Sequence, residues 1–160
     1  MTGSRVSESL EDHFGRAWDM IIEAARHFSP SQWYEARDTR MQPSRIVYHI
    51  LMGADRYSWL GDPKQFPVQR QFPLDWLESP AESFLNQEDA VHQLELAKSR
   101  SLDWVKQVGE AGLLEQKPAW PWTGKCSLGQ AIYHMRHLQH HMAELNAELA
   151  QRGLPIVEWK

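Results

Sequence analysis

The stretch SLGQAIYHMRHLQHHMAELNAEL, residues 127–149, decides the fold class. Its apolar residues recur every three or four positions, which is the period of one face of an α-helix. They are Leu128, Ala131, Ile132, Met135, Leu138, Met142, Leu145 and Leu149. Ser127 and Gln130 have the spacing of an N-terminal capping box, and Gly153 with Pro155 predicts where the helix ends. The stretch therefore predicts a long amphipathic helix.

Three other segments have the same period: residues 7–28, residues 44 to about 60 with Ser44 as the predicted N-cap, and residues 86–109. Asn86 and Asp89 take capping-box-like positions at the start of the last of these. Residues 61–85 hold four prolines and several bulky apolar side chains, too apolar for a disordered linker. We interpret this segment as a long crossover loop packed along a bundle. With no alternating strand pattern and no internal repeat, residues 1–160 are predicted to be one all-α domain, a four-helix bundle.

The composition limits the binding partners and the cellular location that we expect for this chain. The 160 residues are 42% hydrophobic and 24% charged, as in an ordinary globular domain. The net charge of −4 comes with no basic stripe, so no nucleic-acid partner is expected. The start MTGSRVSESL lacks the apolar region of a signal peptide, and no apolar run approaches the roughly 20 residues that span a bilayer. A single cysteine, Cys126, excludes an intramolecular disulfide, so the cytoplasm is the expected location, with no membrane partner.

Four of the eight histidines lie between His134 and His141. Residues three and four apart share a helix face, so His134, His137 and His141 form one stripe and His140 points elsewhere. Two imidazoles four residues apart can each place a nitrogen roughly 2.0–2.1 Å from one metal ion. On a helical wheel this stripe borders the apolar face, with His137 farthest from its centre. Such a border position favours a cleft between helices over the dry centre of a bundle.

His49 is the best candidate for a third ligand. It lies between Val47, Ile50 and Leu51, where an unpaired ring would be costly to bury. His13, His27 and His92 lie on mixed-polarity stretches and are expected at the surface. A core histidine bonded to a neighbour would also explain His49, and a solvated basic face would explain His134, His137 and His140. The combination of a His-x-x-x-His pair with a histidine inside an apolar helix favours a divalent metal site in a bundle.

At these residues the sequence resembles the DinB/YfiT-like superfamily of metal-dependent enzymes. The resemblance rests on Ser44-Arg-Ile-Val-Tyr-His49 and on His137-Leu-Gln-His140-His141-Met-Ala-Glu144-Leu145. CSLGQA (residues 126–131) and LPIVEW (154–159) are also similar to the family, so the resemblance covers essentially the whole chain.

The resemblance implies a four-helix bundle with a long crossover, commonly dimeric, and a metal triad matching His49, His137 and His141. Zinc, nickel and iron occur in such sites. Relatives include thiol-dependent S-transferases, a maleylpyruvate isomerase and a domain of ergothioneine synthesis enzymes. Many relatives follow the last ligand with Arg-Gly-Gln, whereas Met142-Ala143-Glu144 stands here.

These features favour a metal-dependent enzyme that acts on a small molecule, as a transferase using a low-molecular-weight thiol or as a hydrolase. Three histidines leave coordination positions open, and the ion would lower the pKa of a bound water or thiol. Glu144, one turn beyond His141, is the candidate catalytic residue, as a base or as an orienter of a ligand. A solvated helix-face carboxylate is an equal alternative for Glu144. His134 and His140 flank the ligands and are candidates for a proton relay, or for simple packing and solvent exposure.

Other readings stay open. A non-catalytic protein that binds metal or a small molecule, or a stress-related interaction protein, is the main alternative. Cys126 precedes a helix N-terminus that would depress its pKa, but it lies too many helical rises from His137 to share the ion. The apolar loops, rich in tryptophan, predict a homodimer.

Overall fold

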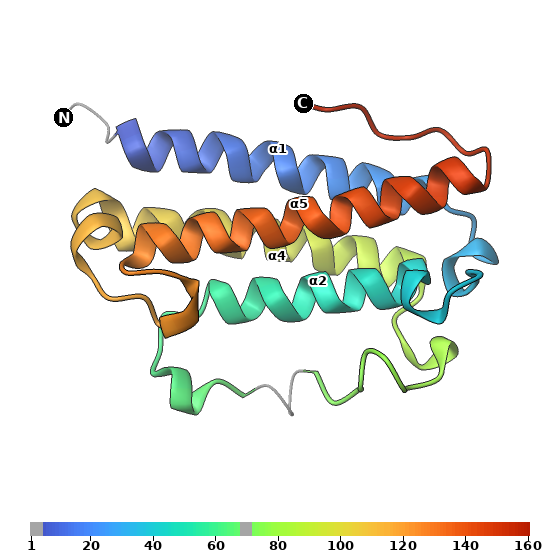
Figure 1. Cartoon of the computed structure of the whole chain (residues 1–160), viewed down its shortest axis with the longest axis horizontal. Helices are drawn as coiled ribbons and strands as arrows, with labels where there is room; N and C mark the ends of the chain where they lie inside the picture. The colour runs from blue at the N-terminus through green and yellow to red at the C-terminus, as the bar shows by residue number, and fades with distance from the viewer. Residues whose placement is uncertain (1–4, 68–71) are drawn as a thin grey trace.

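The structure is a computed structural model that describes residues 5–67 and 72–160. Residues 1–4 of the N-terminal stretch considered for a signal peptide, and residues 68–71 of the expected crossover, lie outside the described residues. The described chain is helical without strands, and its α-helices are α1 (Arg5–His27), α2 (Pro43–Tyr57), α4 (Gln87–Glu115) and α5 (Ser127–Gln151). The predicted all-α four-helix bundle is confirmed (Figure 1).

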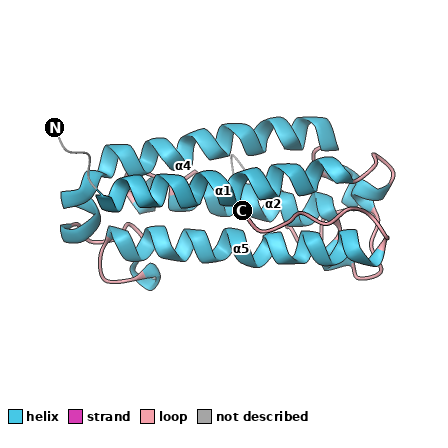
Figure 2. Cartoon of the chain, turned by 90° about the horizontal axis from the view of Figure 1, so that it is seen from above, coloured by secondary structure: helices cyan, strands magenta, loops and turns pink. Residues whose placement is uncertain are grey.

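The order of the helices around the bundle determines which helices are neighbours. α1 packs against α4 and α5, and α2 packs against the same two helices, so α1 and α2 are diagonal. α1 and α5 run one way and α2 and α4 run the other way (Figures 1 and 2). The described parts of the connection between α2 and α4 return along the length of the bundle (Figure 1). α2 and α5 are therefore antiparallel neighbours.

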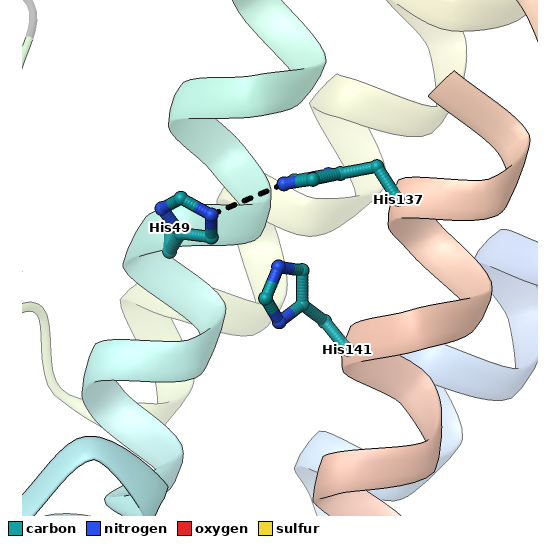
Figure 3. Close-up of side chains that lie close together, drawn as sticks. All are labelled: His49, His137 and His141. Carbon is teal, nitrogen blue, oxygen red and sulfur yellow. Dashed lines mark hydrogen bonds between the residues drawn. The ribbon is translucent and has the colours of Figure 1, made fainter. Parts of the chain in front are cut away.

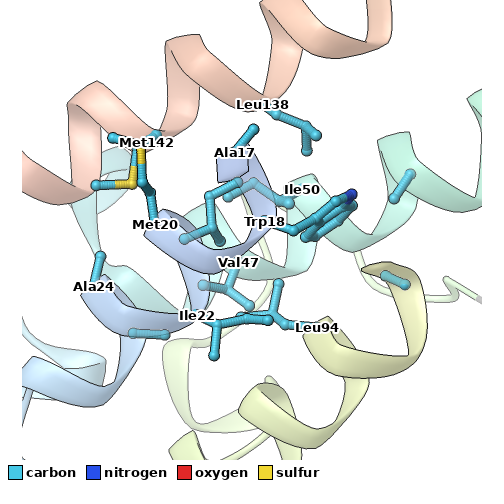
Figure 4. Close-up of a cluster of buried hydrophobic side chains, with 14 of the residues drawn as sticks. Ala17, Trp18, Met20, Ile22, Ala24, Val47, Ile50, Leu94, Leu138 and Met142 are labelled. Atoms are coloured by element: carbon cyan, nitrogen blue, oxygen red, sulfur yellow. The ribbon is translucent and has the colours of Figure 1, made fainter. Parts of the chain in front are cut away.

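The core lies between all four helices (Figure 4). Each fully buried large apolar side chain contributes about 1.5–3 kcal/mol relative to its exposed state. The side chains without solvent exposure include Phe14, Trp18 and Ile21 of α1, Ile50 of α2, Leu94 of α4, and Leu138 and Leu145 of α5. No helix in the described part of the chain combines the length and the apolar character needed to cross a membrane.

The start of α2 differs from the prediction. Pro43 is the first helical residue and Gln42 is the N-cap, without a side-chain capping bond, while Ser44 is buried in the first turn. Proline suits this position because the N–H it lacks would have no partner inside the helix. The prediction of Ser44 as the N-cap is therefore wrong.

The predicted capping box of α5 is also wrong. Cys126 is the N-cap and makes no side-chain capping bond. The Ser127 hydroxyl donates instead to the Gln116 carbonyl at 3.4 Å, and the Gln130 amide donates to the Tyr57 carbonyl at 2.8 Å. Both side chains tie the start of α5 to neighbouring segments.

Other helix ends follow the sequence more closely. The Asn86 side chain accepts from the Asp89 N–H at 2.9 Å, which caps α4 as expected. Gly153, with φ of 65°, follows α5 in a left-handed conformation that suits glycine. Gly109, also at φ 65°, interrupts α4 where its end was predicted, but helical turns continue to Glu115.

Candidate metal centre

Three imidazoles meet where α2 and α5 lie side by side. His49 comes from the middle of α2, and His137 and His141 come from successive turns of α5 (Figure 3). One ring nitrogen from each residue lies within 4.8 Å of the other two. This group could hold a metal ion, and it consists of the three residues that the sequence predicts as ligands.

The distance between two of the nitrogens is compatible with ligands around one ion. His49 Nε2 and His137 Nε2 are 3.2 Å apart. The centroid of the His141 ring lies 4.7 Å from that of the His49 ring and 4.6 Å from that of the His137 ring. Two tetrahedral ligands at roughly 2.0–2.1 Å from zinc are about 3.4 Å from each other. The 3.2 Å separation therefore suits a shared ion, and it also suits a ring-to-ring hydrogen bond when one of the two nitrogens carries a proton.

Glu144 orients the third imidazole. Its Oε2 accepts from His141 Nδ1 at 2.6 Å, which leaves His141 Nε2 for another partner. A carboxylate that holds the second nitrogen of a ligating histidine fixes the tautomer and strengthens the ligand. Glu144, with a side chain 30% exposed, therefore contacts His141 as well as solvent, and its role as a base stays a prediction.

Burial keeps the rings in the form that binds metals. Desolvation, with the nearby charge of His141 as a smaller cause, lowers the pKa of His49 to about 4 and that of His137 to about 2. Burial also lowers the pKa of His141, although the hydrogen bond and charge of Glu144 oppose it. Neutral imidazole is the ligating form, and at pH 7 all three rings are neutral.

Hydrogen bonds at Nδ1 do not set the positions of two of the three rings. His49 Nδ1 and His137 Nδ1 are buried without a hydrogen-bond partner. A buried polar atom without a partner costs free energy, so these rings are not placed by hydrogen bonds at Nδ1. Three neutral imidazoles are a donor set that suits zinc, nickel or iron, and such an ion would bind the Nε2 atoms of His49 and His137 and leave their Nδ1 atoms protonated.

Gly53 makes room for His137. It lies on α2 one turn beyond His49, on the same helix face. A Cβ atom at this position would lie 2.4 Å from His137 Cε1 and 2.9 Å from His137 Nδ1. The His137 ring therefore occupies a notch that only glycine provides.

The connection between α2 and α4 covers one side of the site. The Trp76 ring lies on the His49 ring, with centroids 4.2 Å apart and 30° between the planes. Arg45, 3% exposed, donates to the Trp76 carbonyl at 2.9 Å and to the Ser79 carbonyl at 2.5 Å. The Tyr48 hydroxyl donates to the Leu74 carbonyl at 3.2 Å and accepts from the Leu74 N–H at 3.0 Å. α2 thus holds residues 74–79 over its own histidine.

The side next to α5 is open. A groove of about 590 Å³ is lined by Tyr133, Arg136, His137, Gln139 and His140, so solvent reaches one member of the cluster. Another cavity, of about 460 Å³, lies between α2, α4 and their connection and holds none of the three histidines. The groove on α5 is therefore an open path to His137.

His134 does not join the cluster. It is 1% exposed, and its ring packs against Phe14, Trp18 and Tyr57. His140 is exposed on the outside of α5, with its Nε2 at 3.4 Å from Glu144 Oε1. The predicted stripe therefore splits into a core residue, His134, and two candidate ligands.

The remaining candidates lie elsewhere. Cys126 is half-buried at the start of α5, eleven residues before His137, which is about 16 Å along the helix axis. His13 and His92 are exposed as expected. His27 is half-buried instead, with its Nδ1 2.7 Å from the Pro155 carbonyl, because the C-terminal segment folds back onto α1.

Gly53, Arg45 and Trp76 were not predicted as residues of the site. Gly53 carried a signal, since it lies four residues after His49 in a helix where glycine costs roughly 1 kcal/mol. The placement of Trp76 depends on how the connection folds back, which no local pattern reports.

Comparisons with protein-family models, with curated proteins and with solved structures give no match to this chain. The candidate site therefore rests on residue types and geometry, and the resemblance to the DinB/YfiT-like superfamily stays a prediction.

Proposed function

We propose that this chain binds one divalent metal ion through His49, His137 and His141 and is a metal-dependent enzyme acting on a small molecule. The observation that carries the proposal is the convergence of the three rings, with 3.2 Å between the Nε2 atoms of His49 and His137. The contact between His141 and Glu144 adds the second layer that ligating histidines usually have. Three protein ligands leave coordination positions open, as in catalytic rather than structural sites.

The donor set supports the proposed class of reaction. A divalent ion held by neutral imidazoles lowers the pKa of a water or thiol that it binds, which supplies a nucleophile near neutral pH. We propose transfer or hydrolysis at an electrophilic small molecule, with a low-molecular-weight thiol as the cosubstrate. Zinc, nickel and iron are the proposed ions.

Other residues of the chain have separate proposed roles. Glu144 holds His141 in one tautomer and is the proposed proton acceptor, since its Oε1 makes no hydrogen bond in the described structure. Trp76 keeps water from the His49 side of the site. The groove beside His137 admits the substrate.

Family membership is part of the proposal. A bundle with one histidine on α2 and an i, i+4 pair on α5 is what the resemblance to the DinB/YfiT-like superfamily implies. The residues quoted from the sequence support the same assignment.

Elemental analysis tests the metal site directly. Protein purified without a polyhistidine tag or chelator is expected to carry about one equivalent of divalent metal. His49→Ala and His141→Ala should lose it, while His92→Ala, at an exposed histidine on α4, should keep it. Full metal content in both triad variants would reject the site.

Turnover tests the reaction. The metal-loaded protein is expected to join a low-molecular-weight thiol to a halogenated or epoxide substrate, and His137→Ala should abolish this activity. A protein that binds metal with the expected stoichiometry but turns over none of these pairs and no hydrolysable ester would support the non-catalytic alternative.

A further inference from the structure

A second pair of metal-binding groups lies on α5 outside the triad. His140 and Glu144 are one turn apart, with side chains 69% and 30% exposed. His140 Nε2 and Glu144 Oε1 are separated by 3.4 Å. Together with His141 they form a group whose ligand atoms lie within 4.8 Å of one another.

The distance between the two atoms is compatible with two ligands of one ion. An N–H···O bond is commonly about 2.9–3.0 Å long, so 3.4 Å is long for one. Ligands on one tetrahedral ion are about 3.4 Å apart when each lies roughly 2.0–2.2 Å from the metal. The i, i+4 spacing holds both groups on one helix face.

The Glu144 carboxylate is already oriented for this role. Its Oε2 accepts from His141 Nδ1 at 2.6 Å, which fixes the plane of the carboxylate and directs Oε1 toward His140. An ion at Oε1 leaves that hydrogen bond intact, so His141 keeps its proton at Nδ1 and its Nε2 stays available to the triad. The two sites can therefore be filled together, and Glu144 is available as a proton acceptor while Oε1 holds no ion.

We infer that His140 Nε2 and Glu144 Oε1 form an outer site for an exchangeable divalent cation, completed by water, that captures ions for the triad. One carboxylate and one imidazole suit zinc or nickel. Two protein ligands bind more weakly than three, so the outer ion exchanges readily. The existence of the outer site is independent of the proposed function, whereas its loading role rests on the proposed triad.

The groove on α5 borders one residue of each site. It is lined by His140 of the outer pair and His137 of the triad, so an ion released by His140 lies next to the space that borders His137. The triad consists of neutral rings and offers a cation no charge, while Arg136 adds a positive charge to the same groove. The Glu144 carboxylate is the anionic group that neighbours both sites, which makes capture at the outer pair faster than direct entry.

Titration with zinc ion alone tests the outer site. Chelator-stripped, tag-free protein is expected to bind one tight equivalent and one equivalent at least tenfold weaker by calorimetry. His140→Gln should lose the weaker equivalent and keep the tight one. His92→Gln, a matched exposed histidine on α4, should keep both. A weaker equivalent that persists unchanged in His140→Gln overturns the outer site.

Loading kinetics test the capture role. In stopped-flow mixing with substoichiometric zinc, His140→Gln is expected to fill the triad several-fold more slowly at an unchanged final affinity. An unchanged loading rate overturns the capture role. His49→Ala separates this inference from the proposed function, because it should remove the tight equivalent alone; if it removes neither, the triad assignment fails while the outer site stands.

Discussion

Replacing Gly53 by alanine is expected to weaken metal binding while the bundle stays folded. The new Cβ would lie 2.4 Å from His137 Cε1, whereas ordinary contacts begin at 3.4 Å. The ring and α2 must therefore separate by about 1 Å. Metal–ligand distances tolerate shifts of about 0.2 Å, so His137 leaves the ion. Loss of one ligand in three should raise the Kd for zinc at least about 100-fold, which is roughly 2.7 kcal/mol.

Gly15 in α1 is the matched control. A Cβ at this position meets nothing within 4 Å. Gly15→Ala should therefore gain the helix propensity of alanine, about 0.5–1 kcal/mol of unfolding free energy, and leave the Kd unchanged. Gly53→Ala should gain the same free energy of unfolding from helix propensity, and displacement of the His137 ring should cancel part of that gain. Its metal defect would then appear in a protein about as stable as the native chain.

Two measurements decide this prediction. Competition with a chromophoric zinc chelator at pH 7.4 gives the Kd for each protein, and urea unfolding in excess chelator gives the stability of each metal-free protein. A Kd for Gly53→Ala within about threefold of the native value would refute the claim that metal binding by His137 requires glycine at position 53. A Cβ 2.4 Å from His137 Cε1 would leave no space for the ring in its present position.

Three further outcomes are expected. Glu144→Gln should raise the Kd for zinc about 10–100-fold in the chelator assay, because His141 loses its carboxylate partner; an unchanged Kd would contradict the orienting role. Burial lowers the pKa of His134 to about 3 in the folded chain, so below pH 6.5 the unfolded chain takes up the proton first. The contribution of His134 to the free energy of unfolding is then complete above about pH 6.5 and falls toward pH 3 by up to about 1.4 kcal/mol per pH unit. His134→Leu should reduce the slope of stability against pH by about one proton in urea unfolding at stepped pH. Light scattering at micromolar concentration is expected to show a homodimer, given exposed Trp122, Ile132 and Trp159, and a monomer alone would end that prediction.

The helices were predictable from the sequence because apolar spacing reports burial directly. Their capping was less predictable. Ser127 and Gln130 have the local pattern of a capping box, yet both bond to neighbouring segments, at Gln116 and Tyr57. A capping motif and a tertiary hydrogen bond use the same side-chain atoms, and only the packed structure decides between them.

The candidate ligands were predictable for a similar reason. His137 and His141 are one helical turn apart whatever surrounds them, and the apolar neighbours of His49 place it at a helix interface. The contacts of Gly53 and Trp76 depend on the tertiary arrangement and not on the local sequence. Gly53 meets His137 only because α2 and α5 are antiparallel neighbours, and Trp76 reaches His49 only because Arg45 holds the returning connection.

His134 and His137 show what decides the role of a histidine in this bundle. They are three residues apart, and both have a pKa well below the ordinary value, to about 3 and about 2. His134 faces α1, where Phe14 and Trp18 pack against it, and it belongs to neither possible metal-binding group found among the described residues. His137 faces the notch at Gly53 and meets His49 across the interface of α2 and α5. Burial alone thus makes a neutral ring, and a ligand requires in addition a neighbouring helix that carries a second imidazole at the same level.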